Sequence, residues 1–104
     1  MDELIVFWTH TAQRQRDHIF DYWNKRNNSK SYSKKLNLAI LEKIRLLKYH
    51  PELGKATNFG STKVISMRHY SILYKIDHPK LIITGFWDNR QNPVKLLKFK
   101  KKQD

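Results

Sequence analysis

Hydrophobic residues in the second half of the chain form three short runs. They cover Val64–Met67, Tyr70–Ile76 and Leu81–Trp87, and short polar breaks separate them. Their β-branched and aromatic residues suit a pleated, half-buried surface, and such short connections favour antiparallel neighbours. The pattern therefore predicts a three-stranded meander. The last run is apolar at almost every position, which is typical of a central strand covered on both faces or partly covered by a partner.

The first half of the chain holds one apolar run followed by two helical patterns. Leu4–Trp8 is short and apolar, which predicts a buried strand. Thr9 suits a helix N-cap, and apolar residues then recur at helical spacing until a turn near Asn28. A second helix, ended by Pro51, has a wide apolar face. That face comprises Tyr32, Leu36, Ala39, Ile40, Ile44 and Leu47, widened by Leu38, Leu41 and Leu46.

The order strand–helix–helix–strand–strand–strand predicts an α+β fold. Two helices joined by a short polar loop form an antiparallel hairpin, and a small, mostly antiparallel sheet can cover its apolar face. Glu52–Thr62 has little periodicity and is expected to be a loop. The length suits one domain with one core. We expect residues 1–97 to form that domain and residues 98–104 to form a basic tail.

The charge of the chain is strongly positive and unevenly distributed. It has 21 Lys and Arg against 9 Asp and Glu, a net charge of +12. Residues 1–22 hold two Arg against four acidic residues, a net −2, so the rest carries +14. Such a field attracts nucleic acid, an anionic membrane or an acidic protein.

Two further features of the sequence narrow the kinds of site and the cellular location that can be expected. The absence of Cys excludes disulfides and thiolate metal sites. The first eight residues begin acidic and have an apolar run of only five residues, so they predict neither a signal peptide nor a membrane span. We therefore expect a cytoplasmic protein with no membrane partner.

Three motifs resemble the RelE/ParE superfamily of bacterial type II toxins. They are HPELG (His50–Gly54), ILYKI (Ile72–Ile76) and FWDNRQNP (Phe86–Pro93), of which the last is the most specific. The similarity spans residues 3–97. It implies a RelE/ParE-like fold, no cofactor, and a small acidic antitoxin as partner. In this superfamily RelE-like members cut messenger RNA on the ribosome, and ParE-like members poison DNA gyrase.

The resemblance also implies a metal-independent site of cationic side chains. Ribonucleolytic cleavage requires removal of a proton from the 2′-OH, neutralisation of the phosphorane and protonation of the 5′-oxygen. Arg90 matches the family's Arg after the last strand, while Arg68 and His69 lie near its second cationic position. The family's Arg after the aromatic residue of the preceding strand falls on Ser71. The family's acid beyond Arg90 falls where Lys95 is the only titratable residue.

Four other residues are expected to contact nucleic acid, namely Lys63, Trp87, Lys95 and Lys98. Trp87 could stack on a base, although a buried Trp at a strand end is the alternative. Neighbouring Asp88 is expected to form a local ion pair or cap and to orient Arg90. Apart from His69, the His residues are scattered without metal-ligand spacing, so no metal site is expected; they are His10, His18, His50 and His78.

The sequence thus predicts the toxin of a type II toxin–antitoxin pair, acting as a ribosome-dependent mRNA endoribonuclease. A gyrase inhibitor with no enzymatic activity is the alternative, and a chain that only binds its antitoxin is the third. The feature that separates them is whether positions 68–71 and 90–96 form one concave cationic patch.

Overall fold

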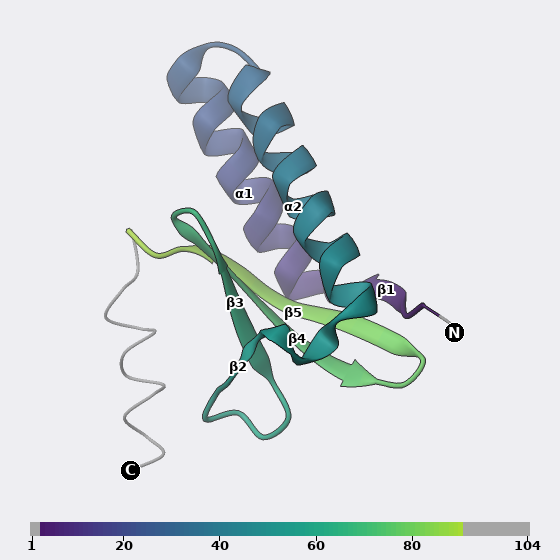
Figure 1. Cartoon of the computed structure of the whole chain (residues 1–104). Helices are drawn as coiled ribbons and strands as arrows, with labels where there is room; N and C mark the ends of the chain where they lie inside the picture. Colours follow the sequence, from purple (N-terminus) through teal and green to yellow (C-terminus); the bar gives the residue numbers. More distant parts are fainter. Residues whose placement is uncertain (1–2, 91–104) are drawn as a thin grey trace.

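Two antiparallel helices pack against one face of a five-stranded sheet. Figure 1 shows the computed structural model, which describes residues 3–90. The elements are β1 (Ile5–Trp8), α1 (His10–Asn27), α2 (Ser31–Tyr49), the 3-10 helix η1 (Pro51–Leu53), β2 (Lys55–Ala56), β3 (Lys63–Met67), β4 (Tyr70–Asp77) and β5 (Lys80–Asp88). The predicted α+β fold and its element order are confirmed, with β2 as an addition.

The sheet has the order β1-β5-β4-β3-β2. Met67 pairs with Tyr70, and Asp77 pairs with Lys80. The turns from β3 to β4 and from β4 to β5 therefore have two residues each. These three strands are the predicted antiparallel meander. The N-terminal strand β1 lies beside β5 and runs parallel to it. β5 lies between β1 and β4 and is central as predicted. Its burial alternates along the strand, so only one of its faces is fully covered, and the expected coverage on both faces is wrong.

Local capping chemistry sets the ends of the helical hairpin. The Thr9 hydroxyl accepts a hydrogen bond from the Ala12 amide at 3.1 Å, which confirms the predicted N-cap. After α1, Asn28 has a left-handed backbone with φ of 50°, a conformation that Asn tolerates well. The Ser29 hydroxyl then accepts from the Ser31 amide at 3.1 Å where α2 begins. The turn predicted around Asn28 is therefore confirmed.

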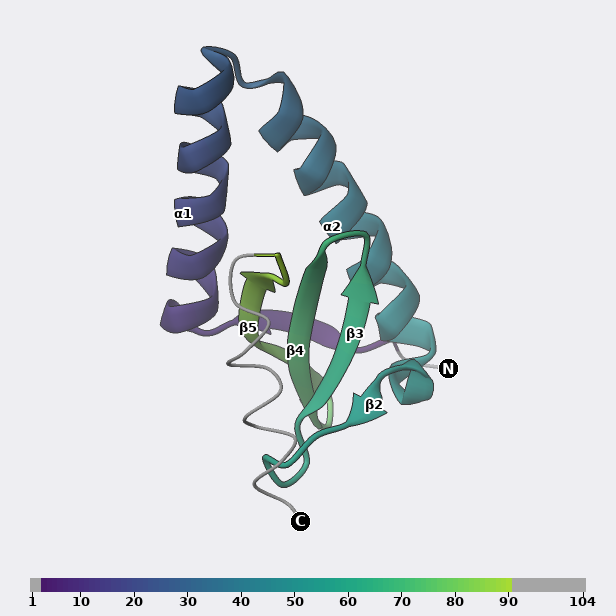
Figure 2. The same ribbon diagram turned by 90° about the vertical axis from the view of Figure 1, so that its left-hand side faces the viewer.

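The core lies between α2, α1 and one face of the sheet (Figure 2). The buried residues of α2 are Ser33, Leu36, Ile40, Ile44 and Leu47. Leu38, Leu41 and Leu46, expected to widen this face, are instead exposed. The reason is that the sheet covers only one side of α2, so these residues point away from the core.

Tyr74 fastens η1 to the sheet. Its ring is fully buried. Its hydroxyl donates to the Pro51 carbonyl at 2.7 Å and accepts from the Gly54 amide at 2.9 Å. A Cβ on Gly54 would lie 2.4 Å from that hydroxyl, so only Gly fits this approach. The segment expected to be a plain loop therefore begins with η1 and β2.

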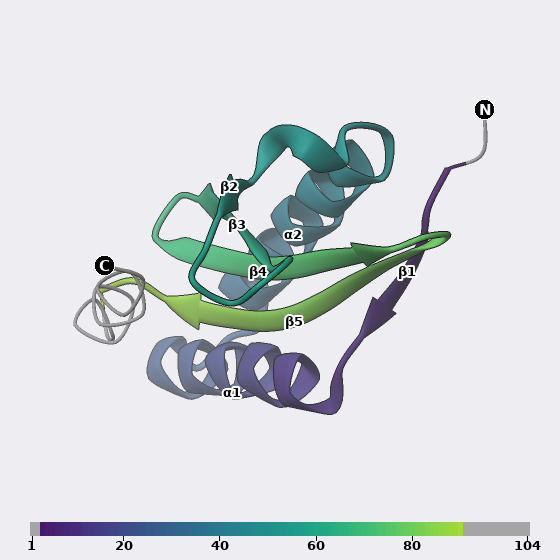
Figure 3. The same ribbon diagram turned by 90° about the horizontal axis from the view of Figure 1, so that it is seen from below.

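The prediction that β1 is buried is wrong for one of its faces. Ile5 and Phe7 are 54% and 45% exposed, whereas Val6 and Trp8 are half-buried beneath α2. The helices cover only one face of the sheet, and β1 is one of its two outer strands (Figure 3). Beyond the four residues of β1, α1 occupies the edge of β5, where the Gln15 side chain accepts from the Phe86 amide at 2.8 Å.

Candidate functional site

The three predicted cationic residues lie at one end of the sheet. Arg68 and His69 form the exposed turn between β3 and β4, and Arg90 follows β5. The ladder holds these segments together, since Tyr70 pairs with Asp88 and the Asn89 amide donates to the His69 carbonyl at 2.7 Å. The structure therefore brings the ends of three strands together. Residues 91–96 of the expected patch lie outside the described residues.

Arg68 has surroundings different from those of Arg90. Its backbone has φ of +58°, a left-handed conformation that is uncommon for Arg. Arg68 and Met67 line a pocket of about 360 Å³ together with residues of α2, including Glu42 and Lys43. Arg68 is thus placed beside α2. Arg90, in contrast, lies over the ring of Trp23 in α1, with its guanidinium carbon 5.7 Å from the ring centre.

Arg90 is held at two points by a buried carboxylate. Its Nε donates to Oδ1 of Asp88 at 3.1 Å and its Nη2 donates to Oδ2 at 2.9 Å. The Arg90 amide adds a third bond to Oδ1 at 2.8 Å. Asp88 is only 4% exposed, while the Arg90 side chain is 43% exposed. The predicted role of Asp88 in orienting Arg90 is confirmed by this geometry.

The electrostatics of the pair follow from its contacts. Burial raises the pKa of Asp88, but the hydrogen bonds and charge of Arg90 outweigh it, so the pKa lies below its ordinary value. The hydrogen bonds to Asp88 raise the pKa of Arg90 above its ordinary value. Both groups are charged over the physiological range and largely neutralise each other. The charge that Arg90 can offer a phosphate is reduced accordingly.

Tyr70 lies beneath Arg90 and links the helices to the sheet. Its ring is fully buried and stacks on Phe86 with a centroid distance of 5.4 Å. Its hydroxyl lies 3.0 Å from that of Tyr32 in α2, and Arg90 Nη2 donates to it at 3.5 Å. Burial, followed by the hydrogen bond with Tyr32, raises the pKa of Tyr70. This phenol remains protonated at neutral pH and is a poor general base.

Ser71 lies at the position where the resemblance implies an Arg. It is 1% exposed, and its hydroxyl donates to the Asn89 side chain at 2.8 Å. The hydroxyl is thereby used to connect β4 to the segment after β5. A cationic side chain does not extend from this position.

Of the predicted nucleic-acid contacts, the two that the structure describes do not lie together. Lys63 begins β3 and pairs with Tyr74, so it lies toward the other end of the sheet. Trp87 is half-buried and pairs with Ser71. Because side chains alternate along a strand, Trp87 points to the face opposite Phe86 and Asp88. Lys95 and Lys98 lie outside the described residues.

Comparison with known proteins places this geometry in a family. The family described as the ParE toxin of type II toxin–antitoxin systems, parDE, matches residues 6–93. The chain belongs to the ParE toxin family. A solved structure described as the chromosomal ParDE TA system from P. aeruginosa shares the fold of this ParE-family chain, with a TM-score of 0.68. Sequence identity is 14%, and the match covers 83% of this chain and 96% of the other. No curated protein matches the sequence.

The described part of this ParE-family chain was compared with the requirements of a metal site and of a membrane-spanning helix. Within residues 3–90, no three His, Asp or Glu side chains are grouped so that they could hold a metal ion. None of the helices in that range is long and apolar enough to cross a membrane.

Sequence reasoning missed two members of this site in the ParE-family chain, Tyr32 and Tyr70. Tyr32 was assigned to the apolar face of α2, and Tyr70 was treated only as the start of a strand. A signal for Tyr70 was present, since it shares the two-residue period of Ile72 and Tyr74. Their hydroxyl–hydroxyl contact depends on the packing of α2 on β4, which the local sequence does not encode.

Proposed function

We propose that this chain is the cytoplasmic toxin of a type II toxin–antitoxin pair and that it inhibits DNA gyrase by binding, without cleaving RNA. Membership of the ParE family supports the first part. The observation that supports the second part is the two-point ion pair between Arg90 and buried Asp88. The sequence alone favoured the ribonuclease, and this geometry favours the alternative.

The contacts that the side chains of the site already make limit what they can offer a substrate. A phosphorane-stabilising Arg needs donors aimed at the substrate oxygens. Two of the Arg90 nitrogens already donate to Asp88, whose negative charge offsets the guanidinium. Tyr70 is buried, and the Ser71 hydroxyl already donates its hydrogen bond to Asn89. The described residues therefore supply a stable surface more readily than a proton-transfer site.

The ribonuclease remains a second candidate because of the β3–β4 turn. Arg68 and His69 are both exposed there. A His near a cationic side chain is the kind of group that could exchange protons with a ribose hydroxyl. In that case Arg68 and His69 would be the catalytic groups, and Arg90 would support them.

The test compares two reactions with the same purified protein. In a supercoiling reaction with purified gyrase, we expect the chain to inhibit at concentrations comparable with that of the enzyme. In a translation extract programmed with a defined messenger RNA, we expect the RNA to stay intact. Cleavage of ribosome-bound RNA with unimpaired supercoiling would refute the proposal and establish the ribonuclease.

Two variants make this comparison sharper. If Arg90 stabilised a phosphorane, Arg90→Ala would lose about 2–4 kcal/mol of transition-state stabilisation, about 30- to 1,000-fold in cleavage rate. Lys75→Ala is the matched control, because it removes an exposed cation from the far half of β4. We expect no cleavage by the wild type, by Arg90→Ala or by Lys75→Ala. Arg90→Ala should change gyrase inhibition only as far as it lowers the folded fraction.

A further inference from the structure

Helix α2 carries large apolar side chains on the face that points away from the sheet. Leu38 and Tyr49 are 64% and 58% exposed, and Leu41 and Leu46 are exposed beside them. With 3.6 residues per turn, Leu38 and Tyr49 lie nearly opposite Ile40, which is fully buried in the core. Figure 2 shows α2 along one flank of the molecule, with the sheet on its inner side. Exposed apolar residues gathered on one face are typical of an interaction surface.

This outer face of α2 has the spacing of a coiled-coil seam. Its central residues are Leu38, Glu42, Arg45 and Tyr49, which follow one another at steps of four, three and four. The average step is close to 3.5 residues, the period at which two helices keep the same faces in contact. Leu41 and Leu46 lie on opposite sides of this line of residues. We call the four central residues the α2 seam.

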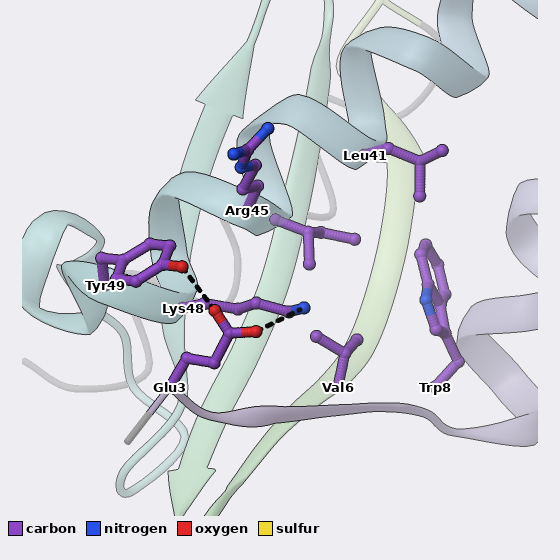
Figure 4. Close-up of a pocket in the computed structure, with 8 residues that line it drawn as sticks. Glu3, Val6, Trp8, Leu41, Arg45, Lys48 and Tyr49 are labelled. Carbon is purple, nitrogen blue, oxygen red and sulfur yellow. Dashed lines mark hydrogen bonds and ion pairs between the residues drawn. The ribbon is translucent and has the colours of Figure 1, made fainter. Parts of the chain in front are cut away.

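Two opposite charges occupy the middle of the α2 seam. Glu42 and Arg45 are both exposed, and the ion pairs among the described residues join other side chains. Figure 4 shows that Arg45 extends away from Glu3, toward which Lys48 and Tyr49 point. The charges of Glu42 and Arg45 are therefore available to another molecule.

The α2 seam matches a second copy of itself in the antiparallel direction. A twofold axis between positions 43 and 44 brings together residues that lie at equal distances on either side of it. Leu38 then meets Tyr49 of the second copy, and Glu42 meets Arg45. Each pair occurs twice, so two ion pairs lie at the centre and an apolar contact lies at each end. Leu41 of both copies borders one side of the contact.

The charges determine the direction of the pairing. In a parallel twofold pair, each residue of the seam would meet its own counterpart, so Glu42 would face Glu42 and Arg45 would face Arg45. Like charges at the centre of a contact are unfavourable, whereas the antiparallel arrangement pairs opposite charges. A nucleic acid would be repelled by Glu42 and would leave the apolar ends uncovered. A second copy is the occupant that satisfies all four residues of the seam.

We propose that two copies of this chain associate through antiparallel α2 helices, with Glu42 of each copy paired with Arg45 of the other. The inference goes beyond the proposed function and does not depend on whether the target is gyrase or the ribosome. The seam extends for about 18 Å along the helix, which is short for a protein interface, so the dimer should be weak and form at micromolar concentration. The net charge of +12 on each copy opposes association, an effect that salt reduces.

The first test follows the sedimentation of the purified full chain across the micromolar range at physiological ionic strength. We expect the average mass to rise with concentration toward that of a dimer. Glu42→Arg replaces both ion pairs by contacts between two Arg and should weaken association at least about tenfold. Asp77→Arg makes the same charge change at an exposed position of β4 and should leave the dissociation constant within about twofold. A chain that stays monomeric, or equal effects of the two variants, would refute the proposal.

The second test restores the lost ion pairs by mixing two variants. Arg45→Glu should also weaken self-association, because Glu then faces Glu. In a mixture of Glu42→Arg and Arg45→Glu, one copy has Arg at both positions and the other has Glu at both. The mixed dimer regains two ion pairs and should form at least about tenfold more readily than the dimer of either variant alone. A mixture that associates no better than its components would overturn the assigned register.

The third test determines the direction of the helices and serves if a charge variant does not fold. The chain has no Cys, so an introduced thiol can form a disulfide only with another introduced thiol. Leu38→Cys and Tyr49→Cys are purified separately, mixed and treated with a mild oxidant. A disulfide requires Cα atoms within about 7 Å, so the antiparallel pair should give the mixed disulfide well above the share expected from random collisions. Predominance of the two symmetric disulfides would refute the antiparallel arrangement.

Discussion

Replacement of Asp88 by Asn should destabilise the fold at neutral pH while leaving its shape unchanged. Asp88 accepts three hydrogen bonds from Arg90, one from the backbone and two from the guanidinium. Asn has one acceptor oxygen, and its NH₂ group would face a guanidinium donor. The variant therefore loses at least one charge-assisted bond, which costs about 1–3 kcal/mol after allowance for the solvent that reaches Arg90.

The effect should be measurable in melting temperature and should depend on pH. For a chain of about this size, the loss corresponds to a decrease of about 4–20 °C in Tm. Because the folded-state pKa of Asp88 is lowered, its carboxylate stabilises the fold above its unfolded-state pKa of about 3.9. That contribution disappears as the pH falls through the folded-state pKa. The gap between wild type and Asp88→Asn should therefore narrow in strong acid.

Urea unfolding followed by tryptophan fluorescence at neutral and strongly acidic pH is a suitable assay, since Trp23 lies beneath Arg90. Asp77→Asn is the matched control, because Asp77 is exposed and lies at the other end of β4. The control should change the unfolding free energy by less than about 0.5 kcal/mol. If Asp88→Asn is as stable as the control, or if its deficit is the same at both pH values, the ion pair does not stabilise the fold as argued.

Three further predictions concern other contacts. Tyr74→Phe removes the bonds to Pro51 and to the amide after η1, so the unfolding free energy should fall by about 1–3 kcal/mol; an unchanged urea midpoint would contradict this. Gln15→Leu leaves the buried Phe86 amide without its acceptor and should cost a similar amount, whereas a variant as stable as wild type would show that water replaces the side chain. Truncation after Leu97 should flatten the salt dependence of binding to DNA or RNA by about 0.7–0.9 for each lost phosphate contact, with retained far-UV circular dichroism; an identical salt slope would exclude a role for the tail in nucleic-acid binding.

The elements with a strong hydrophobic period could be predicted from the sequence. The buried positions of α2 follow its 3.6-residue period, and the cap at Thr9 depends on a contact three residues away. The meander could be predicted in the same way, because short turns bring neighbouring apolar runs together as paired strands. The width of the α2 face was overestimated, since Leu41 and its neighbours are apolar but face solvent. Composition alone does not reveal how much of a helix the sheet covers.

The candidate site could be predicted only in part. Arg68, His69 and Arg90 were correctly placed at one end of the sheet, because strand alternation and short turns determine where strand ends lie. The partners of Arg90 were only partly foreseen. Asp88 is two residues away and was named, whereas Tyr70 meets Arg90 through the register of β4 and β5. The sequence did not predict β2, because a segment of two residues is too short to show a hydrophobic period.

The contact between Gln15 and the Phe86 amide limits how far the sheet can extend. A long bare edge would allow copies of this chain to join strand to strand without end, which is a route to fibres. Here a side chain from α1 closes the edge of β5 beyond β1, and the exposed portion has only four residues. Four residues give few backbone bonds, so attachment there needs matching side chains as well. The same amide contact thus limits self-assembly by strand pairing. It also restricts pairing at this edge to segments whose side chains fit the surface beside β1.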